Sequence, residues 1–110
     1  MAYNLDRLFA IIHSTLLLHP RISLKDLTKL TGVERHTIEK AIKKATGMTF
    51  RELRNRVKLE KVRATLDQLP ILSIKEIAFL LNYGSPSSFS RFVRSASGRC
   101  PSDLRRFIQN

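Results

Sequence analysis

The chain has 110 residues, a length that fits one compact domain. Its 20 lysines and arginines outnumber its 9 aspartates and glutamates, and this net charge of +11 favours a polyanionic partner, nucleic acid first and an anionic membrane second. The single cysteine, Cys100, excludes an internal disulfide and a cysteine-rich metal site.

The first predicted element is an amphipathic helix that begins after Asn4 and stops at His19 and Pro20. Apolar residues recur along it at three- and four-residue steps: Leu5, Leu8, Phe9, Ile12 and Leu16. The first 20 residues contain one basic residue, whereas residues 21–63 contain thirteen. The polyanion is therefore expected to contact the segments after this helix.

Six further helices follow, each marked by a start or stop signal. They are predicted at about 24–31 (Ser23 cap, Gly32 stop), 35–46 (Gly47 stop), 49–68 (Thr49 and Glu52 capping box), 74–81 (Ser73 cap), 86–97 (Pro86 start, Gly98 stop) and 101–109 (Pro101 start). No strand pattern competes with them. The predicted fold is all-α, with about seven helices.

The pattern of the chain repeats. Residues 23–33 match residues 73–83 at an offset of 50, and after the next turn the offset is 51. The later matched pairs are Ile38/Phe89, Lys40/Arg91, Ile42/Val93, Lys43/Arg94 and Gly47/Gly98. We therefore expect two helix-turn-helix units within one domain, 1–110: the first at about 22–47, the second at about 72–98.

Each copy has the residues that a helix-turn-helix needs. Thr28 and Ala78 are small residues for the helix crossing, and Gly32 and Asn82 tolerate the positive φ of the turn. Apolar residues follow that would anchor the second helix: Val33, Ile38, Ala41 and Ile42 in one copy, and Tyr83, Phe89 and Val93 in the other.

The long helix between the units would act as a linker. At ~1.5 Å per residue it is roughly 30 Å long, close to the ~34 Å between successive major-groove openings on one face of DNA. Its apolar residues form two groups, Phe50/Leu53/Val57 and Leu59/Val62/Leu66/Leu69, which we expect to dock the first and second unit respectively.

From Leu24 to Phe107 the sequence resembles the DNA-binding domain of the AraC/XylS family of bacterial transcription regulators. The resemblance is carried by DLTKLTGVERHTIEKAIKKATGMTF, by RNRVKLEKVRATL, and by IKEIAFLLNYGSPSSFSRFVRSASGRCP followed by DLRRF. Asn82, Val93 and the pair Arg99-Cys100 depart from the family's usual Gly, Phe and apolar-Ser. The resemblance implies sequence-specific binding to double-stranded promoter DNA, with RNA polymerase as a further partner, and the single cysteine suits a reducing cytoplasm.

The helices at about 35–46 and 86–97 are the predicted recognition helices. The resemblance places His36, Glu39 and Lys40 at base contacts; chemically, Lys40 suits guanine, Glu39 cytosine and Arg91 guanine. The predicted base-reading residues are Arg35, His36, Glu39, Lys40, Ser87, Ser88 and Arg91. The predicted phosphate contacts are Ser23, Lys25, Thr37, Lys43, Thr49, Arg51, Ser73, Ser85, Ser90 and Arg94.

Several of these assignments have rivals. Glu39 could form an i,i+4 pair with Lys43, His36 could pack half-buried, and Arg91 could clamp a phosphate or pair with an acid of the linker. Because serines discriminate bases weakly, we expect the first unit to carry more base specificity than the second.

Other function classes fit less well. A module for structured RNA or an acidic protein remains the alternative, although an RNA binder would usually expose aromatic residues for stacking. No paired carboxylates, nucleophile–base set or metal-ligand spacing occurs, so neither an enzyme nor a cofactor or metal site is expected. The apolar run at residues 8–18 is too short to span a membrane. We expect a monomer.

Overall fold

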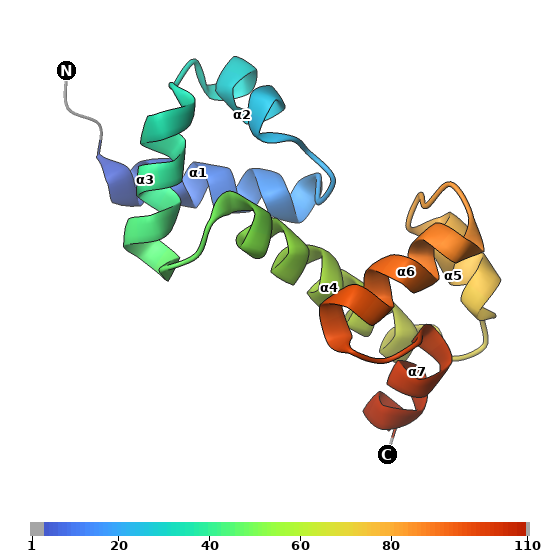
Figure 1. Ribbon diagram of the computed structural model, residues 1–110. Coiled ribbons are helices and arrows are strands. Elements are labelled where there is room, and N and C mark those ends of the chain that lie inside the picture. Colours follow the sequence, from blue (N-terminus) through green and yellow to red (C-terminus); the bar gives the residue numbers. More distant parts are fainter. Residues whose placement is uncertain (1–3, 110) are drawn as a thin grey trace. The chain divides into compact units, whose positions relative to one another are not determined.

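The computed structural model describes residues 4–109, and all regular structure in that range is helical (Figure 1). The helices are α1 (Leu5–Leu18), α2 (Leu24–Thr31), α3 (Arg35–Thr46), α4 (Phe50–Gln68), α5 (Ile74–Leu80), α6 (Pro86–Ser97) and α7 (Pro101–Gln109). The predicted all-α fold with seven helices is confirmed. The helix predicted to reach residue 81 ends one residue earlier, because Leu81 is the C-cap of α5.

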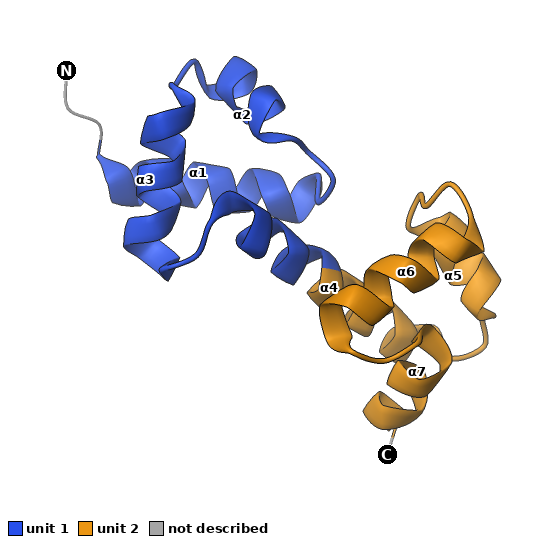
Figure 2. Ribbon diagram, viewed as in Figure 1, with its two compact units in different colours: residues 1–58 blue, residues 59–110 orange. Residues whose placement is uncertain are grey.

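The chain divides into two compact units, unit 1 (Met1–Lys58) and unit 2 (Leu59–Asn110), and the boundary lies inside α4 (Figure 2). Each unit has a hydrophobic core of its own. The core of unit 1 contains Leu8, Ile12, Leu16, Leu27, Val33, Ile38, Ala41, Ile42, Phe50, Leu53 and Val57. The core of unit 2 contains Val62, Leu66, Ile77, Ala78, Tyr83, Phe89, Val93 and Leu104.

The two apolar groups of α4 dock as predicted, with one exception. Phe50, Leu53 and Val57 belong to the core of unit 1, and Val62 and Leu66 to that of unit 2, with Leu59 packed against it. Leu69 was assigned to the second group, and that prediction is wrong: it is 37% exposed. Leu69 directly follows the last residue of α4: its amide still donates to the carbonyl of Thr65, and its carbonyl accepts from the amide of Leu72 in the turn that follows.

Equivalent backbone hydrogen bonds recur in both units, and they extend the repeat beyond the helix-turn-helix. At an offset of 50, the bond from Ile22 N to His19 O recurs from Leu72 N to Leu69 O. At an offset of 51, the bond from Leu53 N to Thr49 O recurs from Leu104 N to Cys100 O. The C-terminal half of α4 therefore corresponds to the end of α1, and α7 corresponds to the N-terminal half of α4.

The two tight turns form as the sequence predicted. Gly32 has φ +68° and Asn82 has φ +64°, both in the left-handed region. The amide of Gly32 donates to the carbonyl of Thr28, and the amide of Tyr83 donates to that of Ala78. Each turn therefore ends the first helix of a pair and starts the chain toward the second.

Candidate nucleic-acid interface

Helix α3 buries one face and exposes another. Ile38, Ala41 and Ile42 have exposed fractions of 1% or less, which fixes the helix on the core of unit 1. The predicted base readers of this helix all lie on its exposed side: Arg35, His36, Glu39 and Lys40. His36 is exposed, so its alternative role as a half-buried packing residue is wrong.

Glu39 forms an ion pair, although not the one considered from the sequence. Its Oε1 lies 2.8 Å from Nε of Arg35, and both side chains are well exposed. Lys43 instead donates from Nζ to the carbonyl of Gly47 at 2.9 Å, which satisfies an open carbonyl at the end of α3. The pair of Glu39 with Lys43 that the sequence allowed is therefore wrong. An exposed pair of this kind contributes little stability and can exchange for a base.

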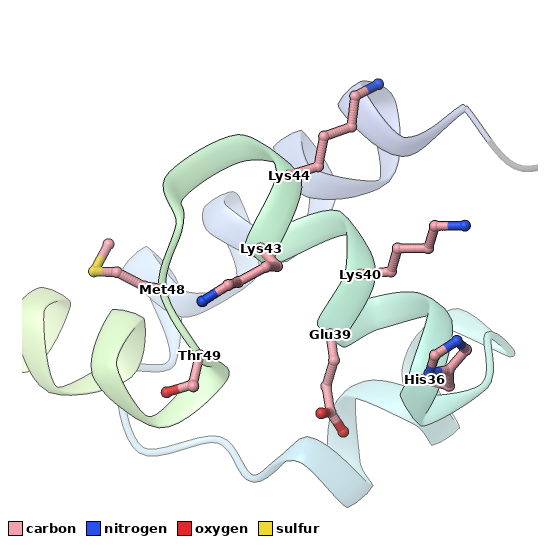
Figure 3. A pocket seen from close by; sticks show the side chains of 7 residues that line it. All are labelled: His36, Glu39, Lys40, Lys43, Lys44, Met48 and Thr49. Atoms are coloured by element: carbon pink, nitrogen blue, oxygen red, sulfur yellow. The ribbon is translucent and has the colours of Figure 1, made fainter.

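An open groove runs along α3 to the start of α4 (Figure 3). It is lined by His36, Glu39, Lys40, Lys43, Lys44, Met48 and Thr49. The groove thus brings three predicted base readers together with two predicted phosphate contacts, Lys43 and Thr49. Figure 3 shows the side chains of Glu39 and Lys40 leaving α3 in different directions, so one helix presents an acceptor and a donor to different neighbours.

Two further residues line this groove: Lys44, which the sequence leaves as either a phosphate contact or part of a solvated face, and Met48, which the sequence did not single out. Nζ of Lys44 lies 3.7 Å from Oδ1 of Asp6 on α1, and both of these side chains are exposed. Met48 is half-buried and packs against the core of unit 1. The sequence signal for Met48 is its place between the Gly47 turn and the Thr49 cap, a junction that must lie beside the end of α3.

Unit 2 presents a different recognition surface. Ser87, Arg91 and Arg94 of α6 are exposed, and within residues 4–109 Arg91 has no ion pair, so the predicted pair with an acid of the linker does not form. Three serines predicted to contact DNA are half-buried: Ser85, Ser88 and Ser90. Two of them cap α6: the hydroxyl of Ser88 accepts from Ser85 N at 3.3 Å and donates to Ser85 O at 2.9 Å.

Carboxylates already occupy three helix N-termini where phosphate contacts are predicted. Ser23 and Asp26 form a capping box on α2, and Ser73 and Glu76 form one on α5. Thr49 and Glu52 exchange equivalent bonds at the start of α4. The hydrogen bonds from Ser23 lower the pKa of Asp26, and those from Ser73 lower the pKa of Glu76. These acids offset the positive end of each helix dipole.

The recognition helices begin differently. The capping box of α6 consists of two serines, Ser85 and Ser88, and its first turn contains no acid. The N-cap of α3 is Glu34, whose side chain makes no cap hydrogen bond. The first turn of α6 therefore keeps its positive dipole end available to an anion, whereas α2, α4 and α5 present theirs already compensated.

The remaining predicted contacts lie at the surface of unit 1. Lys25 of α2 and Arg51 of α4 are exposed, and Thr37 is half-buried on α3. Within residues 4–109 no three histidine, cysteine, aspartate or glutamate side chains group as metal ligands. None of the helices described has both the length and the apolar character needed to cross a bilayer.

Comparisons with known proteins agree with a helix-turn-helix domain. A family model described as a helix-turn-helix domain matches residues 27–106. The chain is 29% identical over 89 residues to the Msm operon regulatory protein of Streptococcus mutans, an alignment that covers 81% of this chain and 32% of that protein. It is 30% identical over 80 residues to the HTH-type transcriptional regulator GlxA of Rhizobium meliloti, covering 73% and 24% respectively.

A solved structure shares the fold. The C-terminal domain of AraT, a response regulator from Geobacillus stearothermophilus, matches with a TM-score of 0.79 and 24% identity over 96% of this chain and 88% of that one. The chain spans about a third and a quarter, respectively, of the two curated relatives.

Proposed function

This chain belongs to the AraC-type helix-turn-helix family, and we propose that it regulates transcription by binding specific sequences in promoter DNA. The observation that supports this most strongly is the exact recurrence of a positive-φ turn, Gly32 in one unit and Asn82 in the other, each followed by a helix with an exposed polar face. Such a helix fits the major groove of DNA. The net charge of +11 suits the phosphate backbone.

We propose that α3 and α6 enter adjacent major-groove segments of one duplex. On α3, Lys40 would donate to O6 or N7 of guanine, and Glu39 would accept from N4 of cytosine after leaving Arg35. On α6, the exposed Arg91 would make a bidentate guanine contact. Supporting evidence is that α4 is one uninterrupted helix of 19 residues that contributes to both cores.

The proposed function also implies a cellular compartment, an oligomeric state and a protein partner. We propose that the chain acts in the bacterial cytoplasm as a monomer with two reading helices, with RNA polymerase as a further contact. Sedimentation of the protein with one bound duplex tests the stoichiometry, since a two-to-one complex would contradict monomeric binding.

The experiment that tests the function is selection from a random library of duplexes at near-physiological salt, where non-specific phosphate binding is suppressed. We expect one enriched motif with two conserved blocks about one helical turn apart. A single short block would leave one unit as a phosphate clamp. No enrichment, with binding that is simply lost as salt rises, would contradict the proposal and favour RNA or an acidic protein as the partner.

A further inference from the structure

The backbone leaves the two recognition helices in the same way. Each helix ends at a left-handed glycine, with φ +75° after α3 and φ +77° after α6. The hydroxyl before that glycine accepts from the amide of the residue after it, from Met48 to Thr46 at 3.0 Å and from Arg99 to Ser97 at 3.1 Å. Met48 and Arg99 are therefore structurally equivalent, at the offset of 51 that relates the two units.

This position belongs to the DNA-binding groove in unit 1. Met48 lines the groove at α3 together with Lys43. At an offset of 51 these two residues correspond to Arg99 and Arg94, and Arg94 is a predicted phosphate contact. Unit 2 thus has a cation where unit 1 has an apolar side chain, at a position that lines the groove of the recognition helix in unit 1.

An aromatic ring holds the side chain of Arg99. Its guanidinium carbon lies 4.3 Å from the centroid of the Phe107 ring on α7, and both side chains are exposed. Within residues 4–109 this guanidinium donates no hydrogen bond and forms no ion pair. The pKa of Asp103 is lowered by hydrogen bonds from Cys100 and Arg106, and the charge of Arg99 contributes least. The nearby carboxylate is therefore bound by other partners.

This arrangement suits an anion. A ring beneath a guanidinium leaves the N–H donors at the edge of that group available. The ring also restricts the side chain, so less conformational entropy is lost when the edge donates to a phosphate. In unit 1 the equivalent positions hold Met48 and Arg56, so the pair of Arg99 and Phe107 is not part of the repeated scaffold.

We propose that Arg99 binds a backbone phosphate of the duplex that α6 reads, and that Phe107 holds its guanidinium in place for that contact. The inference rests on the proposed function and extends the contact surface of unit 2 from α6 to the turn before α7. A phosphate contact positions a protein on DNA without reading its sequence. Arg99 therefore strengthens the binding of the serine-rich unit without adding base specificity.

The test exchanges equivalent residues. Arg99→Met gives unit 2 the residue of unit 1, and Arg99→Lys keeps the charge without the planar fork of donors. The matched control is Arg63→Met, which removes the same charge from an exposed position of α4. Dissociation constants are measured for the selected duplex and for a random duplex between about 50 and 200 mM KCl. Circular dichroism verifies the folding of each variant.

The expected result is a sequence-independent, salt-dependent loss. Arg99→Met should weaken both duplexes by the same factor. Because each neutralised phosphate contributes about 0.9 to the slope of log K against log salt, that factor should be about 3.5-fold larger at the lowest salt than at the highest. Arg99→Lys should bind more weakly with the wild-type slope, and Arg63→Met should keep the wild-type slope and affinity.

Two outcomes would overturn the proposal. Slopes and affinities of Arg99→Met that match those of Arg63→Met would exclude a phosphate contact, and a relaxed preference at one base pair would make Arg99 a base reader instead. If the first outcome is found while the wild-type protein still enriches a motif, this inference fails and the proposed function stands.

The ring is tested separately by Phe107→Leu. This variant should weaken binding to both duplexes and keep the wild-type slope, because the charge of Arg99 remains. Combined with Arg99→Met it should cause no further loss, since the ring acts only through the guanidinium. Additive losses in this double-mutant cycle, or wild-type affinity of Phe107→Leu, would overturn the positioning role of the ring.

Discussion

Units 1 and 2 have apolar side chains at equivalent buried positions and equivalent turns and caps, whereas the residues at their equivalent exposed positions differ. Ile38 in one corresponds to Phe89 in the other, and both side chains are fully buried. On the outside, His36, Glu39 and Lys40 of α3 contrast with the serines around Arg91 on α6, and Arg21 contrasts with Ile71. The comparison teaches that the repeated interior specifies how a recognition helix is held, while the exposed positions are free to specify what it binds.

The largest expected effect is a loss of stability from a substitution that disrupts the core of unit 2 and leaves the core of unit 1 intact. Phe89→Ala removes a ring with 0% exposure and should lower the free energy of unfolding by about 3–5 kcal/mol, since a cavity replaces it. Because the two cores are separate clusters, amide hydrogen exchange should accelerate in unit 2 and much less in unit 1. Urea unfolding and exchange measure the two quantities.

Two matched variants complete this test. The equivalent Ile38→Ala should reverse the pattern, with faster exchange in unit 1, whereas Phe79→Ala at a half-exposed site should change little. Equal acceleration in both units by either core variant would show that the cores unfold as one.

The next effect separates the two recognition helices. Lys40→Ala and Arg91→Ala should each weaken binding by about 1–3 kcal/mol and relax the preference at one base pair, provided that each side chain reads a base. Competition with single-base variants of the selected site measures this. If only Arg91→Ala relaxes the preference, the greater specificity expected of unit 1 is wrong, and unit 2 is the principal reader.

The tight turn of unit 1 predicts an intermediate loss. An added Cβ at Gly32 meets no atom within 4 Å, so the effect of Gly32→Ala comes from φ +68° alone. A left-handed conformation disfavours an L-residue by roughly 1–2 kcal/mol, and thermal unfolding should show that loss. The control is Gly84→Ala, where there is equal space and no positive φ. A comparable loss at both glycines would contradict the explanation.

The smallest effect concerns the caps that both units share. Hydrogen bonds lower the pKa of Asp26 and of Glu76 below their ordinary values of 3.8 and 4.5. A carboxyl with a lowered folded-state pKa stabilises the protein above its unfolded pKa, and the contribution is lost as pH falls through the folded pKa. Asp26→Asn and Glu76→Gln should therefore each flatten the acid side of the stability curve.

Asp67→Asn is the control for this titration, because Asp67 is exposed near the end of α4 and belongs to neither capping box. Unfolding free energies between pH 5 and pH 2, measured in urea, give the curves, with the difference confined to the region below about pH 4.5. Wild-type curvature in both cap variants would show that the caps do not titrate with folding.

Part of the binding surface was predictable because helical spacing alone assigns it. Once Ile38, Ala41 and Ile42 are recognised as buried, helical spacing puts residues 36 and 40 on the opposite side and residues 35 and 39 at its flank, and the structure shows all four exposed. Spacing does not choose among rotamers, so the pairing of Glu39 with Arg35 rather than Lys43 was not predictable. Nor does it show that Ser88 turns its hydroxyl back to cap α6.

The sequence by itself determined the number and order of the helices, the two turns and the composition of both cores. Those features follow from local chemistry: caps, left-handed turn residues and apolar periodicity act within a few residues of one another. Only the tertiary structure decided that Leu69 leaves the core and that Met48 lines the groove at α3. It also placed Arg54 against the carbonyl of Ile22, because interactions between residues more than thirty positions apart exist only after the chain has folded.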